Sequence, residues 1–530
     1  MKIVIAEKIA PSAVDLFRAE SRWKLVTPDQ ISADLPRQLA GADTLIVRSA
    51  VTVDAALLEH ADKLRVIGRA GVGVDNIDLE AATKKGIAVM NTPGANAVAV
   101  AEHTLALMLA LARQLSRADH LTRGGKWEKK SLQGTELRGK TLGIVGLGRV
   151  GVEVARRARA FGMSVVAHDP YVSTSIAREL EIKLISMDEI YAAADYLTLH
   201  VGLTAQTAGM INADTLSGMK KGVRLVNCAR GELVDEAALA AALRSGQVAG
   251  AALDVFAEEP PKNSPLLGLD NVVATPHIAG STREAQEAVG YQIALQVREY
   301  LKRGVIQNAV NVPSVSHEEY VEMQPYIVLG ERLGAFLAQV TEGNLEEISL
   351  RYSGRIAELK TDLVRNGAIK GVLNQMLAER ANLVNAASIA AERGIVVHEI
   401  KKTKTPGGGA ASVLSVLLKT AAAERLGKGA VLHGDRPRLL AVDDIDIEAP
   451  LAGNLVYLRN KDVPGVIGRV GTILGQHRIN IANFSLGRRE SGKPPVEAIA
   501  VVHVDGAVPS RVLEELKQIE AVTAAKAIRL

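Results

Sequence analysis

The chain has 530 residues, of which 48% are hydrophobic, 23% are charged and only 3% are aromatic. Because single hydrophobic cores stop growing at roughly 250–300 residues, this length predicts three or four domains, and the scarcity of aromatic residues predicts aliphatic cores. The near balance of 63 basic and 59 acidic residues argues against nucleic acid as a partner, and the single cysteine, Cys228, excludes an internal disulfide and a cysteine-pair metal site.

Strands alternating with helical stretches recur from Met1 to about Val310, which predicts parallel sheets built from βαβ units. The chain opens on a strand-like segment at 2–6, without an apolar signal core or a transit segment, so we expect a cytoplasmic protein. Further buried strands are predicted at 44–47, 65–67, 141–145, 164–167, 196–199, 224–226 and 272–274.

The longest apolar stretch, at 97–112, is interrupted by Glu102 and His103. It is shorter than the ~20 residues that cross a bilayer, so a buried helix is predicted and a membrane partner is not. Because the stretch is apolar on most faces, burial between subunits is the favoured explanation, and a homo-oligomer, dimer or tetramer, is expected.

A glycine motif at 146–151 lies between the strand at 141–145 and a helical run. Its glycines are Gly146, Gly148 and Gly151. The first permits a tight turn, the second lets the backbone approach a pyrophosphate, and the third lets helix and strand pack closely. The phosphates would then lie at the helix N-terminus, where free N–H groups favour anions. The motif predicts a dinucleotide-binding domain.

The next strand, at 164–167, ends in His168 and Asp169, eighteen residues beyond Gly151. An acid at about twenty residues from the motif is typical of a site for the adenosine ribose. A carboxylate there accepts hydrogen bonds from the ribose hydroxyls and repels a 2′-phosphate. Asp169 therefore predicts NAD, rather than NADP, as the cofactor.

Three polar residues follow buried strands on the side of the sheet where open α/β sheets bind ligands: Arg230, Glu259 and His277. Oxidation of a hydroxy acid moves a hydride and a proton. His277 can take the hydroxyl proton at neutral pH. Glu259, if bonded to the other ring nitrogen, would orient the imidazole. Arg230 suits a substrate carboxylate and can polarise the reacting oxygen.

The C-terminal part begins with a polar, proline-containing linker at 311–318 and contains a second break near Pro450. The predicted domains are 1–97 with 291–314, a cofactor domain at 98–290, an intervening unit at 315–449 and a terminal unit at 450–530. The predicted class is α/β: a Rossmann-type cofactor domain inserted in a flavodoxin-like substrate domain, both doubly wound, followed by two α+β units.

Six motifs together resemble the D-isomer-specific 2-hydroxy acid dehydrogenases, and within them the long-form D-3-phosphoglycerate dehydrogenases. They are VRS at 47–49, GRAGVGVDN at 68–76, the glycine motif at 146–151, NCARGE at 227–232, DVFAEEP at 254–260 and PHIAGST at 276–282. The resemblance covers essentially the whole chain. It implies NAD-dependent oxidation of D-3-phosphoglycerate to 3-phosphohydroxypyruvate, the first step of serine biosynthesis.

The resemblance also implies site residues. The family's arginine, glutamate and histidine fall on Arg230, Glu259 and His277, and no metal is implied. Its cofactor contacts fall on Gly146, Gly148, Arg149, Val150, Gly151, Asp169, Cys228, Ala229, Asp254 (towards the nicotinamide amide) and Gly280.

A phosphorylated hydroxy acid has two anionic ends, so one arginine cannot account for its recognition. Arg48 and Arg69 follow strands of the first lobe and are expected in the cleft, with Ser49 and Gly71 beside them. The basic loop at 126–130 could add charge, from a neighbouring subunit as the resemblance suggests. Two alternatives stay open: a dehydrogenase of another D-2-hydroxy acid, such as lactate or glycerate, and an NAD-sensing binding protein on the same fold.

The terminal unit resembles an ACT domain, a small ligand-binding module that in related enzymes senses L-serine. A strand at 455–458, a turn at 462–466 and a helix to residue 476 precede a second strand. A polar turn that enters a helix can hold a carboxylate, and Asp462 and Asn480 could bind the amino group and backbone of an effector. The alternative is an ACT-like unit used only for assembly.

Overall fold

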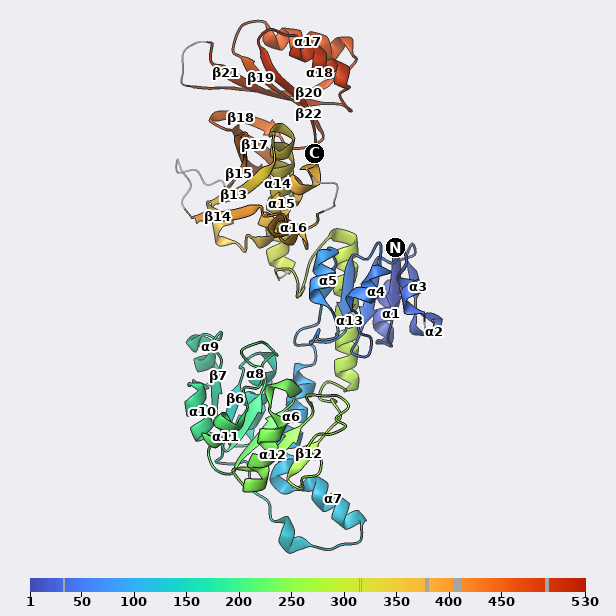
Figure 1. The fold of residues 1–530 in the computed structure, drawn as a ribbon, viewed down its shortest axis with the longest axis vertical. Coiled ribbons are helices and arrows are strands. Elements are labelled where there is room, and N and C mark those ends of the chain that lie inside the picture. Colours follow the sequence, from blue (N-terminus) through green and yellow to red (C-terminus); the bar gives the residue numbers. More distant parts are fainter. Residues whose placement is uncertain (32–33, 314, 316, 377–380, 404–411, 491–494) are drawn as a thin grey trace.

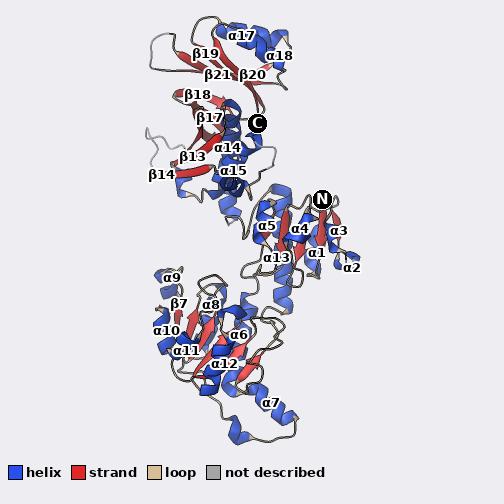
Figure 2. Ribbon diagram, in the orientation of Figure 1, coloured by secondary structure: helices blue, strands red, loops and turns tan. Residues whose placement is uncertain are grey.

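The computed structural model describes the 530-residue chain except residues 32–33, 314, 316, 377–380, 404–411 and 491–494. Four bodies, each built on one sheet, follow one another along the long axis of the molecule (Figure 1). Figure 2 shows that helices cover the sheets in every body. The fold confirms the predicted class, with two parallel-sheet lobes followed by two mixed α and β units.

The first sheet is parallel, with strand order β2-β1-β3-β4-β5, and its strands are β1 (Lys2–Ile5), β2 (Lys24–Val26), β3 (Thr44–Val47), β4 (Val66–Arg69) and β5 (Ala88–Met90). This order is flavodoxin-like. All four residues of β3 are buried, as expected of a parallel strand that is covered on both faces. One covering helix is α1 (Pro11–Arg18), and a second, α13 (Arg283–Arg303), comes from far along the chain.

The second sheet is parallel, with order β12-β11-β10-β9-β6-β7-β8. Its strands are β6 (Thr141–Val145), β7 (Ser164–His168), β8 (Lys183–Leu184), β9 (Tyr196–Leu199), β10 (Val223–Asn227), β11 (Val248–Leu253) and β12 (Val272–Ala274). The order reverses between β6 and β9, which makes the switch point of a doubly wound sheet. The helices of this body that matter for the site are α6 (Ala97–Arg113), α7 (Leu115–Arg123), α8 (Arg149–Ala160) and α12 (Glu236–Ser245).

Helix α6 corrects one argument from the sequence. Its apolar faces pack inside the chain, where Leu105, Met108 and Leu111 share a core with strand and helix residues of the second sheet. Its apolar character is therefore explained without a second subunit. Among the described residues, no single helix has the length and apolar character of a membrane span; only α6 and α7 taken together, bent by 63° between them, reach that length and composition.

The third sheet is mixed, with order β14-β13-β15-β16-β17-β18. Its elements are α14 (His317–Val340), β13 (Leu345–Ser353), α15 (Asp362–Met376), α16 (Ala386–Glu392), β14 (Val396–Lys402), β15 (Val413–Thr420), β16 (Glu424–Leu432), β17 (Arg436–Val442) and β18 (Ile445–Pro450). The fourth sheet has order β20-β21-β19-β22. Its elements are β19 (Asn454–Lys461), α17 (Val466–Gln476), β20 (Ile481–Arg488), β21 (Glu497–Val504), α18 (Ser510–Lys517) and β22 (Val522–Arg529).

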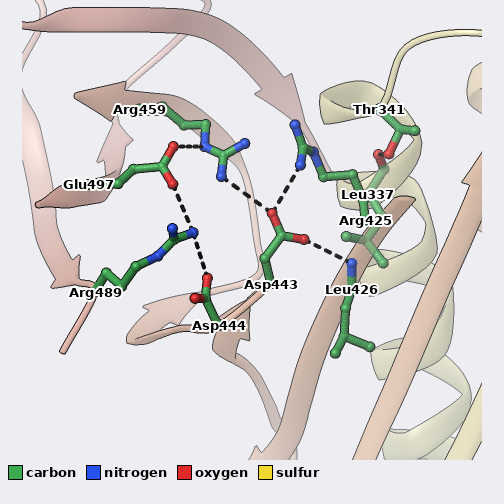
Figure 3. Close-up of polar contacts among 9 residues, drawn as sticks. All are labelled: Leu337, Thr341, Arg425, Leu426, Asp443, Asp444, Arg459, Arg489 and Glu497. Carbon is green, nitrogen blue, oxygen red and sulfur yellow. Dashed lines mark hydrogen bonds and ion pairs between the residues drawn. The ribbon is translucent and has the colours of Figure 1, made fainter. Parts of the chain in front are cut away.

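A charged network joins the last two sheets (Figure 3). We call it the joint network; its members are Arg425, Asp443, Asp444, Arg459, Arg489 and Glu497. Asp443 lies 3.0 Å from Arg425 and 3.4 Å from Arg459, and it accepts a hydrogen bond from the Leu426 backbone at 3.1 Å. Glu497 lies 2.9 Å from Arg459 and 3.1 Å from Arg489, which also meets Asp444 at 2.9 Å. Three cations and three carboxylates thus neutralise one another.

Candidate active site

A cleft of about 740 Å³ is lined by loops that follow strands of the first two sheets. Arg48 and Ser49 come directly after β3, the loop 70–73 after β4, the turn 228–232 after β10 and the loop 276–281 after β12. These loops leave the carboxyl ends of parallel strands, where such sheets bind ligands. The cleft therefore gathers residues from both lobes.

His277 and Glu259 form a hydrogen-bonded pair in this cleft. His277 Nδ1 lies 2.7 Å from Glu259 Oε2, and the two side chains are 53% and 37% exposed. Glu259 is fixed in turn, because its Oε1 accepts from the Phe256 backbone at 3.1 Å. The bond expected between the carboxylate and the ring is therefore present, and Nε2 of His277 is the ring nitrogen left for another partner.

Three arginines line the same cleft: Arg48, Arg69 and Arg230. Arg230 Nε lies 3.0 Å from Asp75, whose side chain is 64% exposed. Among the described residues, neither Arg48 nor Arg69 has a carboxylate within ion-pair distance, and the buried Nε of Arg69 has no hydrogen-bond partner. Burial lowers the pKa of Arg69, and the positive charge of Arg230 lowers it further. Two cations without an ion-paired carboxylate, beside a third whose carboxylate partner is exposed, favour an anionic ligand in the cleft.

The glycine motif has the local geometry of a dinucleotide loop. Gly146 has φ +93°, in the region that favours glycine. A Cβ on Gly151 would collide with the Gly146 carbonyl oxygen, so helix α8 and strand β6 pack closely only with glycine there. Gly148 precedes α8 and faces open space. Backbone N–H groups at the start of α8 thus stand free for a pyrophosphate, with Arg149 and Val150 in the first turn.

Asp169 stands beside this loop, at the end of β7. Its Oδ2 accepts from the Leu147 backbone at 2.9 Å, and its Oδ1 accepts from Tyr171 at 2.8 Å and Val172 at 3.2 Å. A carboxylate has about four acceptor positions. The residues present therefore fit NAD: a free helix N-terminus for the phosphates and a fixed carboxylate with acceptor capacity left for a ribose.

Asp254 is held by hydrogen bonds within the protein, and its contact with the nicotinamide amide stays a prediction. Its side chain is fully buried and does not line the cleft. Both oxygens are engaged: Oδ1 by the Thr275 hydroxyl at 2.6 Å and Ile278 N at 2.9 Å, Oδ2 by Ala279 N at 2.8 Å. Within the described structure Asp254 thus holds the loop that carries His277.

Further predicted residues line the cleft, and their contacts with cofactor or substrate stay predictions. The cleft lining includes Ser49, Gly71, Val150, Cys228, Ala229 and Gly280, whereas the basic loop 126–130 does not reach the cleft of its own chain. Burial raises the pKa of the Cys228 thiol to about 12.

Asp75, Asn96 and His200 are among the cleft residues that were not predicted as site residues from the sequence. Burial lowers the pKa of His200 to about 4, and its Nε2 lies 3.0 Å from the Thr198 hydroxyl. Asp75 lies inside the motif at 68–76, so the signal was present. His200 follows β9 directly and could have been found by the rule that located Arg230.

A smaller cavity of about 330 Å³ lies at the start of α17. Asp462, Asn460 and Gly465 line it, together with apolar residues of the fourth sheet. The pairing of Asp462 with Asn480 was wrong for a single chain, because Asn480 follows the other end of α17 and donates to Asp505 at 2.8 Å. An eleven-residue helix is about 16 Å long. One small molecule therefore cannot touch both residues in one chain.

Three family patterns match successive parts of the chain. Residues 105–279 match the NAD-binding domain of D-isomer specific 2-hydroxyacid dehydrogenases, 322–443 the D-3-phosphoglycerate dehydrogenase intervening domain, and 455–521 the ACT domain.

Curated relatives match over the whole length. D-3-phosphoglycerate dehydrogenase of Archaeoglobus fulgidus is 41% identical, with 100% of both chains covered, and that of Methanocaldococcus jannaschii is 40% identical, with 98% of both covered. A solved D-lactate dehydrogenase from Aquifex aeolicus, complexed with NAD and lactic acid, is 31% identical, with a TM-score of 0.52. It covers 59% of this chain and 100% of its own. A solved glyoxylate reductase from Paecilomyes thermophila is 33% identical, with a TM-score of 0.54. The match covers 58% of this chain and 98% of that one.

Proposed function

The chain belongs to the D-3-phosphoglycerate dehydrogenases, within the D-isomer-specific 2-hydroxyacid dehydrogenase family, and from that premise we propose how its cleft performs their reaction. It is an NAD-dependent dehydrogenase that oxidises D-3-phosphoglycerate, a reaction of serine biosynthesis. NAD, when bound, supplies the acceptor for the hydride that leaves C2 of the substrate. The product is 3-phosphohydroxypyruvate.

His277 is the proposed acid–base residue. Its Nε2 takes the proton of the C2 hydroxyl as the carbonyl forms, and Glu259, bonded to Nδ1, keeps the ring oriented and stabilises its protonated form. In the reverse direction the same nitrogen returns the proton. The single observation that carries this proposal is the 2.7 Å bond between His277 and Glu259 in a cleft that also contains three arginines.

Arg230 is proposed to bind the substrate carboxylate and to polarise the C2 oxygen. A guanidinium presents a planar fork of donors that matches a carboxylate. Arg48 and Arg69 supply the charge for the phosphate end. The fact that supports this assignment is that, among the described residues, neither side chain has a carboxylate within ion-pair distance, so both guanidinium charges are left for a ligand.

Turnover assays test the proposal. NADH formation is measured with D-3-phosphoglycerate, D-lactate and D-glycerate, for the wild type and His277→Ala. We expect turnover of the phosphorylated substrate only, and a fall of about 10²–10⁴-fold in the variant with NAD binding retained. A preference for D-lactate or D-glycerate would contradict D-3-phosphoglycerate as the substrate. Near-normal turnover by His277→Ala would remove this residue from the mechanism.

The terminal ACT domain indicates a small-molecule effector. We propose L-serine, held by the start of α17 with Asp462 in the lining of the cavity. Because a ligand shifts only an equilibrium between states that it binds unequally, serine must favour a less active state. Serine is titrated against the wild type and Asp462→Ala, with Asn480→Ala as the matched variant at the other end of the helix. Asp462→Ala alone should lose inhibition. If serine does not inhibit the wild type, the ACT domain would serve only for assembly.

The proposed domains are 1–97 with 291–314, 98–290, 315–449 and 450–530, each supported by one sheet. The boundary at 290 falls inside α13, because this helix starts beside the cleft and ends on the first lobe. Cytoplasmic localisation is also proposed, and so is a homo-oligomer. The support for association is Trp127, 76% exposed on the segment after α7 that extends away from the second sheet (Figure 1). Light scattering of the wild type and Trp127→Ala tests association.

A further inference from the structure

The loop that carries the proposed acid–base residue is held in an unfavourable backbone conformation. His277 has φ +53°, a region that residues other than glycine seldom adopt. Such a conformation persists only when the surroundings fix it. What fixes it is behind the cleft: His277 N donates to the Asp254 carbonyl at 2.8 Å, and the Asp254 carboxylate accepts from Thr275, Ile278 and Ala279.

Asp254 can act as this anchor only if its buried charge is satisfied. Burial would raise the pKa of its carboxyl, but hydrogen bonds from His103, Thr275 and two backbone amides outweigh burial and leave the pKa below its usual value. A buried carboxylate that lost a donor would be costly to keep charged. Every group that donates to Asp254 therefore contributes to the position of the loop.

His103 is the member of this set that comes from another element. It lies on α6, with Nε2 3.1 Å from Thr275 Oγ1 and 3.4 Å from Asp254 Oδ1. The Thr275 hydroxyl has one proton, which it donates to Asp254 at 2.6 Å, so its oxygen can only accept from the histidine. This fixes the histidine tautomer: Nε2 carries a proton, and the chain of donors runs from His103 through Thr275 to Asp254.

We propose that His103 is a positioning residue for the dehydrogenase reaction: from α6 it donates through Thr275 to Asp254 and so holds the loop that aims His277 into the cleft. The inference rests on the role proposed above for His277. Asn96, on the turn before α6, lies close to Gly280 at the other end of the same loop, so α6 supports the loop at two points.

Variants of His103 with different reach test the proposal. The amide nitrogen of glutamine can take the place of Nε2, whereas that of asparagine is one bond short. We expect His103→Ala and His103→Asn to lower kcat about tenfold, since small misplacements of reacting groups are costly. His103→Gln should recover to within about threefold of the wild type, with KM for NAD nearly unchanged in all three. Glu102→Gln, an exposed neighbour on the same helix, is the matched control and should behave as wild type.

A double-mutant cycle with Thr275→Val tests the path. If His103 acts through Thr275, adding His103→Ala to Thr275→Val lowers kcat by less than twofold further, whereas independent effects would multiply. Equal kcat for the glutamine, asparagine and alanine variants, or multiplying effects in the cycle, would overturn the proposal. An inactive wild type, or a normally active His277→Ala, would instead overturn the proposed function.

Discussion

Two groups of three arginines sit in the molecule, and their surroundings are opposite. In the joint network, Arg425, Arg459 and Arg489 each contact a carboxylate, and three acids cancel their charge. Among the described residues, Arg230 is the one cleft arginine with an ion-paired acid, the exposed Asp75. Nearby Glu7 accepts hydrogen bonds from the backbone amides of residues 48, 50 and 51. The ion-paired arginines of the joint network hold two sheets together, whereas cleft arginines without an ion-paired acid are left for a ligand.

The largest expected effect comes from Arg230. Arg230→Ala should lower kcat/KM for D-3-phosphoglycerate by about 10²–10³-fold, because it removes a charged, bidentate partner of the substrate. The melting temperature should change little, since the arginine's one acidic partner is exposed. Steady-state kinetics and thermal melts are measured together. If Arg230→Ala loses much stability as well as activity, Arg230 stabilises the fold, as the arginines of the joint network do.

Substitution of Arg69 should also weaken substrate binding without loss of stability, but by less than substitution of Arg230. Arg69→Gln is expected to raise the substrate KM about tenfold, as one of two cations at the phosphate end is lost. Stability should stay equal or increase, because the variant relieves a buried guanidinium of its repulsion by Arg230. Arg37→Gln, 85% exposed on the same lobe, is the control. An unchanged KM would contradict a role in substrate binding.

Substitutions in the joint network should lower stability and leave turnover unchanged. Asp443→Asn leaves two arginines short of charge and should lower the free energy of unfolding by about 1–3 kcal/mol, while turnover stays normal. Asp444→Asn, with one arginine and a 57% exposed side chain, should cost less than about 1 kcal/mol. Urea denaturation of the full chain gives both values. Lost turnover in Asp443→Asn would mean that the network acts on the cleft.

Cys228 should give the smallest response, although it lines the cleft. With its pKa raised to about 12 by burial, about one thiol in 10⁴ is ionised at pH 8, and the thiolate is the reactive form. Iodoacetamide at pH 8 should leave activity intact over hours. Rapid inactivation, prevented by Cys228→Ser, would show that the cleft arginines activate the thiol after all.

The sequence predicted the parallel sheets and the site strands well, because buried β-branched runs such as β3 and the glycine motif of β6–α8 are local patterns. Strand β11 was missed. Its residues Val-Ala-Gly-Ala-Ala-Leu include a single β-branched side chain, and the strand is recognisable only by its place between β10 and β12.

Other differences come from information that a sequence does not contain. Asn480 is close to Asp462 along the chain, yet α17 separates them, since the pattern of a helix does not say which end faces a cavity. The sequence likewise does not show that the Asp254 carboxylate accepts hydrogen bonds from the backbone amides of Ile278 and Ala279. Both outcomes depend on tertiary packing.

Helix α13 completes the first lobe from far downstream, because Ile293 and Val297 share one core with Ile3, Ile5 and Ile46. During synthesis, residues 1–90 leave the ribosome about 200 residues before this helix. At 5–20 residues per second that delay is roughly 10–40 s. By the end of this delay the second sheet has all its strands, whereas one apolar face of the first sheet is still covered only by α1. The cofactor-binding domain can thus fold before the first lobe is complete. The apolar face of the first sheet that α13 later covers is where a chaperone would be needed.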